Sequence, residues 1–331
     1  YVVDEADVES HAYDTSLHRD ARFRSTWFDR PARMVERDRN HPCVIAWSLG
    51  NESGYGAVHD AGAAWIRTTD PARPVLYEGA IFHHGWADGG RGTTELVCPM
   101  YPEIERLADY AASDADRPLI MSEYSHAMGN SNGSLADYWE LIESSPKLQG
   151  GFIWEWKDHG IRQRLSGGRT RLAHGGHFGD MPNDANFVAD GLVSADLEPH
   201  PAMHEVAWVY RPVAVTRARG GLRIHNRRAF TGLRDLVATW EYVTVEAVGR
   251  RGRLRVPSVP PDGSVVVPLP VDDAGWLTIR WTTRDNTWFA PAGHLVAVDQ
   301  VALGRPARRR RPPVGTPPED LVAPRLRLWR A

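Results

Sequence analysis

Six short apolar runs in the first half of the chain constrain the fold more than any other feature. They cover residues 1–7, 43–51, 74–79, 96–101, 118–124 and 150–156. The runs are rich in Val, Ile and aromatic residues and do not alternate with polar residues, which is typical of strands buried on both faces. Apolar residues recur at helical spacing between them, in residues 27–39, 57–69, 103–112 and 134–143. Alternating strands and helices predict a parallel sheet with crossover helices.

The predicted strands end on polar or acidic side chains. These are Asp4 and Glu5, Asn51 and Glu52, Glu78, Tyr101, Glu123, and Glu155. In a (β/α)₈ barrel the reacting groups stand at the carboxyl ends of the strands, whereas an open doubly wound sheet gathers its ligand groups at one switch point. Polar ends on successive strands favour the barrel. Because six strands are fewer than eight, we expect an incomplete TIM barrel, about strands 3–8, with exposed strand edges.

The texture of the sequence changes beyond residue 160. Residues 163–205 form a long polar loop region that completes the predicted barrel domain, residues 1–205. Residues 206–304 contain short alternating runs separated by Gly, Pro and Asp, which predicts an immunoglobulin-like β-sandwich. Residues 305–331 are rich in Pro and Arg and are expected to form a linker and the start of a further domain. The predicted fold class is therefore α/β plus all-β.

Charge, hydropathy and cysteine usage restrict the partners and the compartment. The net charge of −3 argues against a nucleic-acid surface. No stretch approaches the roughly 20 apolar residues of a membrane span. Cys43 and Cys98 both lie in apolar runs, where a free thiol behaves as a small hydrophobe. We therefore expect a cytoplasmic protein, although a signal peptide before Tyr1 remains an open alternative.

Glu52 and Glu123 are the strongest candidates for chemistry. Each follows an apolar strand, and Glu123 comes three strands after Glu52. Across a barrel mouth, two such carboxylates can lie roughly 5 Å apart, so that one attacks a sugar while the other protonates the leaving oxygen. Their mutual repulsion drives one towards the protonated form. The alternative is a structural role, with both paired to arginines at the barrel rim.

Five stretches occur in an order and spacing that carry further information: RDRNHPCVIAWSLGNESGYG, CPMY, PLIMSEYSHAMGNS, LQGGFIWEWKDHGI and HFGDMPNDANFVADGLV. Together they resemble successive landmarks of the bacterial β-galactosidases of glycoside hydrolase family 2. The resemblance covers roughly residues 1–205 and continues more loosely over residues 206–300. It implies a retaining hydrolase that cleaves terminal β-D-galactose from β-galactosides such as lactose, with Glu123 as the nucleophile and Glu52 as the acid and then the base.

The same resemblance implies roles for polar residues near the two carboxylates. Tyr101, at the end of CPMY, would contact the nucleophile and help its departure; a phenol suits this role because it donates one hydrogen bond without adding charge. Asn51 would hold the sugar's 2-hydroxyl, a bond that strengthens in the transition state. His126 would bind the sugar.

One tryptophan and one loop residue complete the expected sugar contacts. Trp154 resembles the aromatic floor on which the galactose ring lies in the family. The neighbouring Trp156 is expected to be a core residue. Asn183 lies in the polar loop region, where a sugar contact is plausible from its amide side chain.

Two ion sites are also implied. Glu9 and His11 are two residues apart, so in extended chain they project to the same side. With Glu52 they resemble the family's magnesium site, and the imidazole would also tolerate manganese. Phe187, through its carbonyl, and Asp190 resemble a sodium site, although the best-known member of the family has Asn at the position of Asp190.

Several readings remain open. The Asn-Glu pair and the second Glu are common to a wider clan, so a β-glucuronidase or β-mannosidase is the nearest alternative. The family carries further domains before and after the matched region, so we expect a fragment that is inactive and aggregation-prone when isolated, or a non-catalytic sugar-binding remnant. The expected partners are a small-molecule β-galactoside and, for the full-length protein, further copies of itself.

Overall fold

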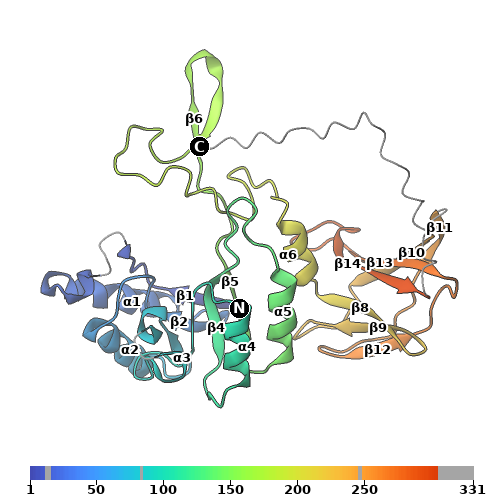
Figure 1. Cartoon of the computed structure of the whole chain (residues 1–331), viewed down its shortest axis with the longest axis horizontal. Coiled ribbons are helices and arrows are strands. Elements are labelled where there is room, and N and C mark those ends of the chain that lie inside the picture. Colours follow the sequence, from blue (N-terminus) through green and yellow to red (C-terminus); the bar gives the residue numbers. More distant parts are fainter. Residues whose placement is uncertain (12–15, 83–84, 245–247, 305–331) are drawn as a thin grey trace, which may run out of the picture. The chain divides into compact units, whose positions relative to one another are not determined.

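The chain divides into two compact units, Tyr1–Val209 and Tyr210–Ala331 (Figure 1). The computed structural model describes residues 1–11, 16–82, 85–244 and 248–304. The predicted linker, residues 305–331, lies outside the described residues.

Parallel strands that pair in chain order form the framework of the first unit. They are β1 (Val2–Glu5), β2 (Val44–Ser48), β3 (Val75–Leu76), β4 (Leu119–Tyr124) and β5 (Leu148–Ile153). The first three form one parallel sheet, and β4 pairs in parallel with β5. Because consecutive strands run in the same direction, their carboxyl ends meet at one edge.

The predicted strand at residues 96–101 is present only as isolated parallel bridges. Val97 pairs with Leu119, and Met100 pairs with Glu123. The backbone N–H of Glu95 donates to the carbonyl of Val75 at 3.0 Å, which places this segment between β3 and β4. Pro99 lacks an N–H, so a continuous ladder cannot form here.

Helices connect these strands, as the periodicity predicts. The long ones are α1 (Arg24–Asp38), α2 (Ala57–Thr69), α4 (Ile104–Ala112) and α5 (Leu135–Ser144). Shorter elements are η2 (Leu17–Arg19), η3 (Ala21–Phe23), η4 (Glu78–Ile81), α3 (Gly85–Asp88) and α6 (Met203–Val209). Helix α1 buries Trp27, Pro31, Met34 and Val35, a stripe at helical spacing. This stripe joins one core cluster with Trp47 of β2 and Ile66 of α2.

Further short elements follow β5 in the chain. An antiparallel hairpin consists of β6 (Ile161–Arg164) and β7 (Thr170–Ala173), with the turn η5 (Ser166–Gly168) between them. Figure 1 shows this hairpin beyond β5. The following loop returns to the sheet edge, where Val193 forms a bridge with Lys157.

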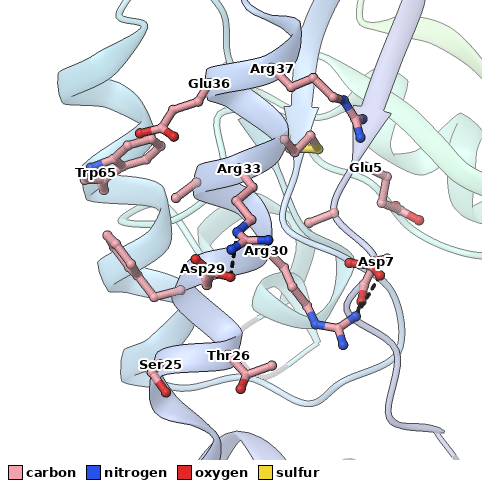
Figure 2. A pocket seen from close by; sticks show the side chains of 14 residues that line it. Glu5, Asp7, Ser25, Thr26, Asp29, Arg30, Arg33, Glu36, Arg37 and Trp65 are labelled. Carbon is pink, nitrogen blue, oxygen red and sulfur yellow. Dashed lines mark hydrogen bonds and ion pairs between the residues drawn. The ribbon is translucent and has the colours of Figure 1, made fainter.

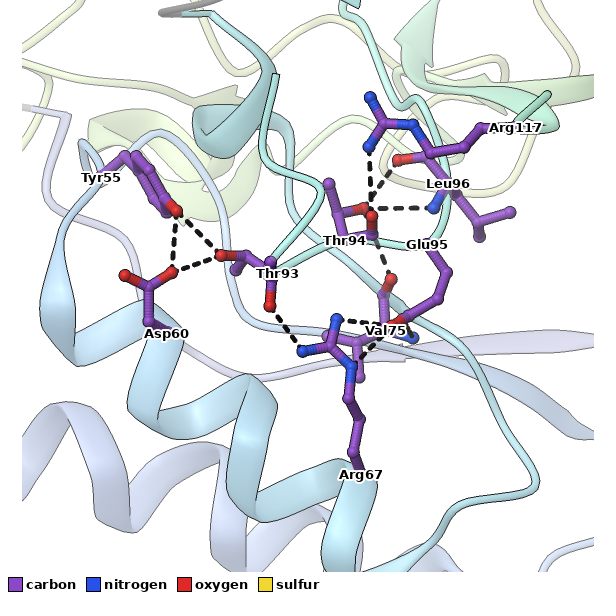
Figure 3. A network of polar contacts seen from close by, with 10 residues as sticks. Tyr55, Asp60, Arg67, Val75, Thr93, Thr94, Glu95, Leu96 and Arg117 are labelled. Carbon is purple, nitrogen blue, oxygen red and sulfur yellow. Dashed lines mark hydrogen bonds and ion pairs between the residues drawn. The ribbon is translucent and has the colours of Figure 1, made fainter. Parts of the chain in front are cut away.

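A polar network ties the βα units together (Figure 3). Arg67 of α2 donates from Nε to Glu95 at 2.6 Å, and Glu95 accepts the backbone N–H of Val75 at 2.7 Å. The buried Arg117 donates to backbone carbonyls, among them those of Thr94 and Trp86. These bonds attach the segment before residue 96 to both neighbouring strands.

The second unit is all β. Its strands are β8 (Val213–Ala218), β9 (Gly221–Asn226), β10 (Leu236–Val243), β11 (Val248–Arg253), β12 (Ser264–Val267), β13 (Gly275–Thr283) and β14 (Leu295–Leu303). They form two antiparallel sheets, ordered β12-β9-β8 and β11-β10-β13-β14. Leu222 and Ile224 of one sheet share a core cluster with Leu277 and Ile279 of the other. Alternate residues along these strands therefore bury one face of each sheet in a common core.

Two burial expectations are wrong. Cys43 precedes β2 and is exposed, whereas Cys98 is buried as expected. Trp156 is 61% exposed and is not a core residue; it lies after the end of β5, outside that strand. Within the described residues, no helix is both long enough and apolar enough to cross a membrane.

Candidate active site

Glu123 lies near the carboxyl end of β4 and is bound by Tyr101 in two ways. The Tyr101 hydroxyl donates to Oε2 of Glu123 at 2.6 Å, and the Tyr101 backbone N–H donates to the Glu123 carbonyl at 2.9 Å. Tyr101 has φ of 44°, a conformation that bulky residues rarely adopt. The backbone bond holds this conformation and aims the phenol at the carboxylate.

The surroundings of Glu123 change its protonation. Burial raises the pKa of its carboxyl to about 7, the Tyr101 hydrogen bond opposes this rise, and the negative charge of Glu52 adds to it. The pKa of Tyr101 is raised as well, by burial and then by the bond to Glu123, so the phenol stays a donor. The effect of Glu52 on the pKa of Glu123 indicates that the two predicted carboxylates lie near enough to interact electrostatically.

We expect Tyr101→Phe to raise the pKa of Glu123 further, because the hydrogen bond that favours its ionised form is lost. A hydrogen bond to a charged group corresponds to about one pKa unit or more. The Glu123 carboxyl would then stay protonated up to a higher pH. An NMR titration of the carboxyl-labelled Glu123 measures this shift, with the exposed Glu103→Gln as a control that leaves it unchanged. An equal or lower pKa in Tyr101→Phe would contradict the assignment.

Glu52 lies in the loop that follows β2. Its backbone has φ of 37°, and its N–H donates to Oε1 of Glu78 at 2.9 Å. Its side chain is 37% exposed, and its Oε2 lies 3.7 Å from Nδ1 of His11. The Glu52 backbone is thus held in place, while its carboxyl group remains accessible. This suits a residue that exchanges protons with substrate or water.

Asn51 and Glu9 lie beside Glu52. The Asn51 amide donates to Oε2 of Glu9 at 2.8 Å, and the Asn51 backbone N–H donates to the carbonyl of Val8 at 2.8 Å. The His11 backbone N–H donates to Oε1 of Glu9 at 3.4 Å. The segment after β1 is therefore attached to the loop after β2, and the predicted Glu9, His11 and Glu52 become neighbours.

Aromatic residues form the other side of the site. The ring of His126 lies 6.1 Å from that of Tyr101 and 5.5 Å from that of Phe187, measured between centroids. Trp154 donates from Nε1 to Oδ2 of Asp190 at 3.3 Å. The charge of Asp190 also contributes to the raised pKa of Tyr101. These contacts connect the residues after β5 and β4 to the two carboxylates.

Asp190 carries a polar atom without a partner. The residue is only 3% exposed, and its Oδ1 makes no hydrogen bond to the described residues. A buried carboxylate oxygen in this state has a large desolvation cost unless a proton, a cation or a water contacts it, and the Glu155 carboxyl lies within hydrogen-bonding reach of Asp190.

Asn183 does not join this cluster through the contacts that the structure records. Its Nδ2 donates to the carbonyl of Asp180 at 2.8 Å, and its Oδ1 accepts the N–H of Ala185 at 3.1 Å. Its side chain packs against Gly175 and Gly176. The amide therefore orders its own loop, an alternative that a polar sequence pattern cannot separate from a sugar contact.

No group of three or more His, Cys, Asp or Glu side chains is arranged to hold a metal ion in the described part of the chain. In the predicted magnesium set, Glu9 is engaged by Asn51, while His11 and Glu52 face each other at 3.7 Å. The donor chemistry fits a hard cation, but the three side chains do not form a preassembled site.

A separate pocket of about 910 Å³ lies beside α1 (Figure 2). Four of its charged residues pair with one another: Arg33 with Asp29 at 2.9 Å, and Arg30 with Asp7 at 2.8 Å. Neither Glu52 nor Glu123 lines it. Volume alone therefore does not identify the reactive site of this chain.

A parallel α/β unit with two carboxyl groups acting on each other beside the ends of its strands is typical of enzymes that cleave glycosidic bonds. The chain belongs to the glycosyl hydrolases family 2, whose TIM barrel domain matches residues 1–215. A second profile, "Beta-galactosidase, domain 4", matches residues 222–304.

Two curated relatives agree with this assignment. "Beta-galactosidase 2" of Enterobacter cloacae is 37% identical over 99% of this chain and 34% of its own length. "Beta-galactosidase" of Klebsiella pneumoniae is 38% identical over 97% of this chain and 33% of its own. A solved β-glucuronidase of Ruminococcus gnavus aligns over 55% of this chain and 34% of its own, with 18% identity and a TM-score of 0.37. The chain spans about a third of the length of the curated relatives it matches.

Proposed function

We propose that this chain carries the catalytic centre of a retaining β-galactosidase that releases terminal β-D-galactose from β-galactosides such as lactose. The hydrogen bond from Tyr101 to the buried Glu123, with Glu52 acting on the same carboxyl, is the observation that carries the proposal. Relatives named β-galactosidase that are 37% and 38% identical support the choice of sugar.

The reaction would proceed as a double displacement. In the first step the Glu123 carboxylate attacks the anomeric carbon, while Glu52 donates a proton to the departing oxygen. A covalent galactosyl ester forms on Glu123, and the alcohol leaves. In the second step Glu52 removes a proton from water, the water attacks the anomeric carbon, and Glu123 leaves as a carboxylate. The Tyr101 phenol stabilises that returning charge.

The neighbouring residues would bind the sugar. Asn51, which precedes the acid, would hold the 2-hydroxyl, and His126, whose ring lies 6.1 Å from that of Tyr101, would bind another hydroxyl. Trp154 is 37% exposed, so part of its indole face is available to the C–H face of a galactose ring. We leave Asn183 out of this set, because its amide is used within its own loop.

We also propose the finer architecture. The parallel strands of the first unit would be consecutive strands, about 3–8, of a TIM barrel, and the second unit would be an immunoglobulin-like sandwich. Chain-order parallel pairing and the two antiparallel sheets with a common core support this proposal.

Magnesium, or manganese in its place, would bind between Glu9, His11 and Glu52. The charges of Glu5, Glu9 and Glu52 all raise the pKa of Glu123, so this edge is strongly acidic and a divalent cation would relieve the repulsion. Binding would require Glu9 to exchange its bond with Asn51. When bound, the ion would tune the acidity of Glu52.

We expect magnesium to raise the melting temperature in a concentration-dependent way, because a ligand of the folded state stabilises it. Replacing Glu9 by Gln should remove most of that shift, whereas the exposed Glu103→Gln should keep it. Thermal unfolding with and without magnesium measures both. Equal shifts in the two variants would exclude this site.

Sodium is the second proposed ion. The buried Oδ1 of Asp190, which makes no hydrogen bond to the described residues, supports a cation there, and Phe187 would contribute its carbonyl. We further propose a cytoplasmic location and a homo-oligomer for the full-length protein.

The substrate specificity is tested on the natural polypeptide that carries these residues. We expect nitrophenyl β-D-galactoside to be hydrolysed with kcat/KM at least about 100-fold above the glucuronide and the mannoside, since hydroxyl-specific sites discriminate strongly. A preference for either of the other two would assign the chain to a related β-glycosidase. Binding without hydrolysis of any of them would identify a sugar-binding remnant.

A further inference from the structure

We propose that Tyr77 and Glu78, directly after β3, form a clamp that positions Glu52 for proton transfer. Both are positioning residues: they act on Glu52 through the loop at residues 52–56. This inference rests on the proposed function for the role of Glu52, and on the contacts below for the clamp itself.

Glu78 holds the backbone of Glu52. Its Oε1 accepts the Glu52 N–H at 2.9 Å, and its carboxyl also interacts with the backbone N–H groups of Gly79 and of Glu78 itself. Glu78 is only 3% exposed, and within the described residues no arginine, lysine or histidine forms an ion pair with it. The partners of this buried carboxyl are thus backbone groups, one of which belongs to the proposed acid.

Tyr77 holds the next two residues of the loop. Its hydroxyl donates to the carbonyl of Gly54 at 2.6 Å and accepts the N–H of Ser53 at 3.3 Å. Its ring stacks on His59 of α2 at 4.4 Å between centroids. The phenol therefore bridges a donor and an acceptor of the loop while its ring is locked against a helix.

The rest of the loop is fastened as well. The Gly56 N–H donates to Nδ1 of His59 at 3.2 Å. The Tyr55 hydroxyl donates to Asp60 at 2.7 Å (Figure 3). A Cβ at Gly79 would lie 2.6 Å from the Gly54 carbonyl, so the close approach of the two segments requires glycine there. Every residue from 52 to 56 thus has a contact with the end of β3 or with α2.

The clamp explains how Glu52 keeps its unusual backbone. A φ of 37° is sparsely populated by residues other than glycine and persists where surrounding contacts determine it. Proton transfer requires the acid within hydrogen-bond reach of the leaving oxygen, and small displacements reduce it steeply. Loosening the loop should therefore impair the step that needs the acid more than the attack of Glu123.

Leaving-group dependence separates this effect from general damage. A dinitrophenyl galactoside departs without protonation, whereas an alkyl galactoside needs the acid. We expect Glu78→Leu to lower kcat/KM about 100-fold for methyl β-galactoside and less than about 5-fold for the dinitrophenyl galactoside, within the range of general acid catalysis. Tyr77→Phe should show the same selectivity, more weakly. Glu78→Gln, which keeps an acceptor oxygen, should recover most of the loss.

Amide hydrogen exchange tests the clamp without activity. We expect Glu78→Leu to accelerate exchange of the Glu52 N–H at least about 10-fold, because its acceptor is lost. The matched control is Asp70→Leu, which removes a similarly buried carboxylate that accepts from Trp47 and Arg73 before β3 begins. It should leave both the Glu52 exchange and the substrate selectivity unchanged.

The outcomes separate the two hypotheses. Unchanged Glu52 exchange, or an equal loss on both substrates, would overturn the clamp even in an active enzyme. If the wild type hydrolyses no glycoside, the proposed function fails and the exchange result alone decides the clamp. If Glu78→Leu does not fold, Tyr77→Phe carries the same two measurements, and Glu78→Gln serves as the variant that should keep both the slow exchange and the activity on methyl β-galactoside.

Discussion

Glu123→Gln is expected to lower kcat for galactoside hydrolysis by about 10⁴-fold or more, since removal of a covalent nucleophile leaves only binding and orientation. Glutamine keeps the volume of the side chain and an oxygen that accepts from Tyr101, so the fold should be retained. The variant should still bind the sugar. Steady-state kinetics with nitrophenyl β-D-galactoside measures the loss, and thermal unfolding verifies that the chain is intact.

A control variant and a labelling experiment test the role of Glu123 further. Glu103→Gln, an exposed carboxylate after the segment at residues 96–101, should retain nearly full activity. A 2-deoxy-2-fluoro galactoside with a good leaving group should label wild-type Glu123 as an ester, because the fluorine slows the second step more than the first. Labelling of any other side chain, or residual activity of Glu123→Gln within 10-fold of the wild type, would remove Glu123 from its role.

The pH dependence of the wild type follows from the same residue. Burial and the charge of Glu52 raise the pKa of Glu123 to about 7, and the neutral acid cannot attack. Activity measured as kcat/KM should therefore fall as the pH decreases through about 7.

Glu52→Ala should produce the second large effect, and its size should depend on the leaving group. A general acid contributes about 10² to 10⁴-fold, so methyl β-galactoside should lose that much in kcat/KM. A dinitrophenyl galactoside should lose little in kcat/KM, because its first step needs no acid. Its kcat should fall instead, since water is no longer deprotonated in the second step and the ester accumulates.

Azide tests this interpretation, because it needs no deprotonation and fits the space left by the removed side chain. Added azide should raise kcat of Glu52→Ala on the dinitrophenyl substrate and release β-galactosyl azide, the product of retention. Glu123→Gln serves as the comparison: azide should not restore retention there. Equal losses on both substrates, with no effect of azide, would assign Glu52 a structural role such as holding the loop.

Much of the candidate site could be predicted from the sequence. Glu52 and Glu123 each follow an apolar run, and the polar end of a buried strand is a local signal that survives without any knowledge of contacts. Helix α2 was expected at residues 57–69 and occupies Ala57–Thr69, because its apolar spacing and its flanking Gly56 and Asp70 are both local. The strand expected at residues 96–101 forms only isolated bridges. The cause is again local, since Pro99 interrupts the hydrogen-bond ladder.

The roles of other residues depend on which groups the fold brings close to them. Asn183 is as polar in sequence as Asn51, but one amide binds its own loop and the other binds Glu9, 42 positions earlier in the chain. Glu78 shows the same dependence. In sequence it is one more acidic strand end, and only its burial against the Glu52 N–H reveals a positioning role. Trp156 was expected in the core, yet it is exposed beyond β5.

The amino-acid sequence by itself determined the order of strands and helices, the two carboxylates at strand ends and the family, because these follow from local periodicity and from motifs. Only the tertiary structure decided which polar groups share a partner, how burial and Glu52 together raise the pKa of Glu123, and which loop is clamped. The physical reason is that hydrogen bonds and charge interactions act through distances of a few ångströms, and the distance between two residues far apart in sequence is set by folding.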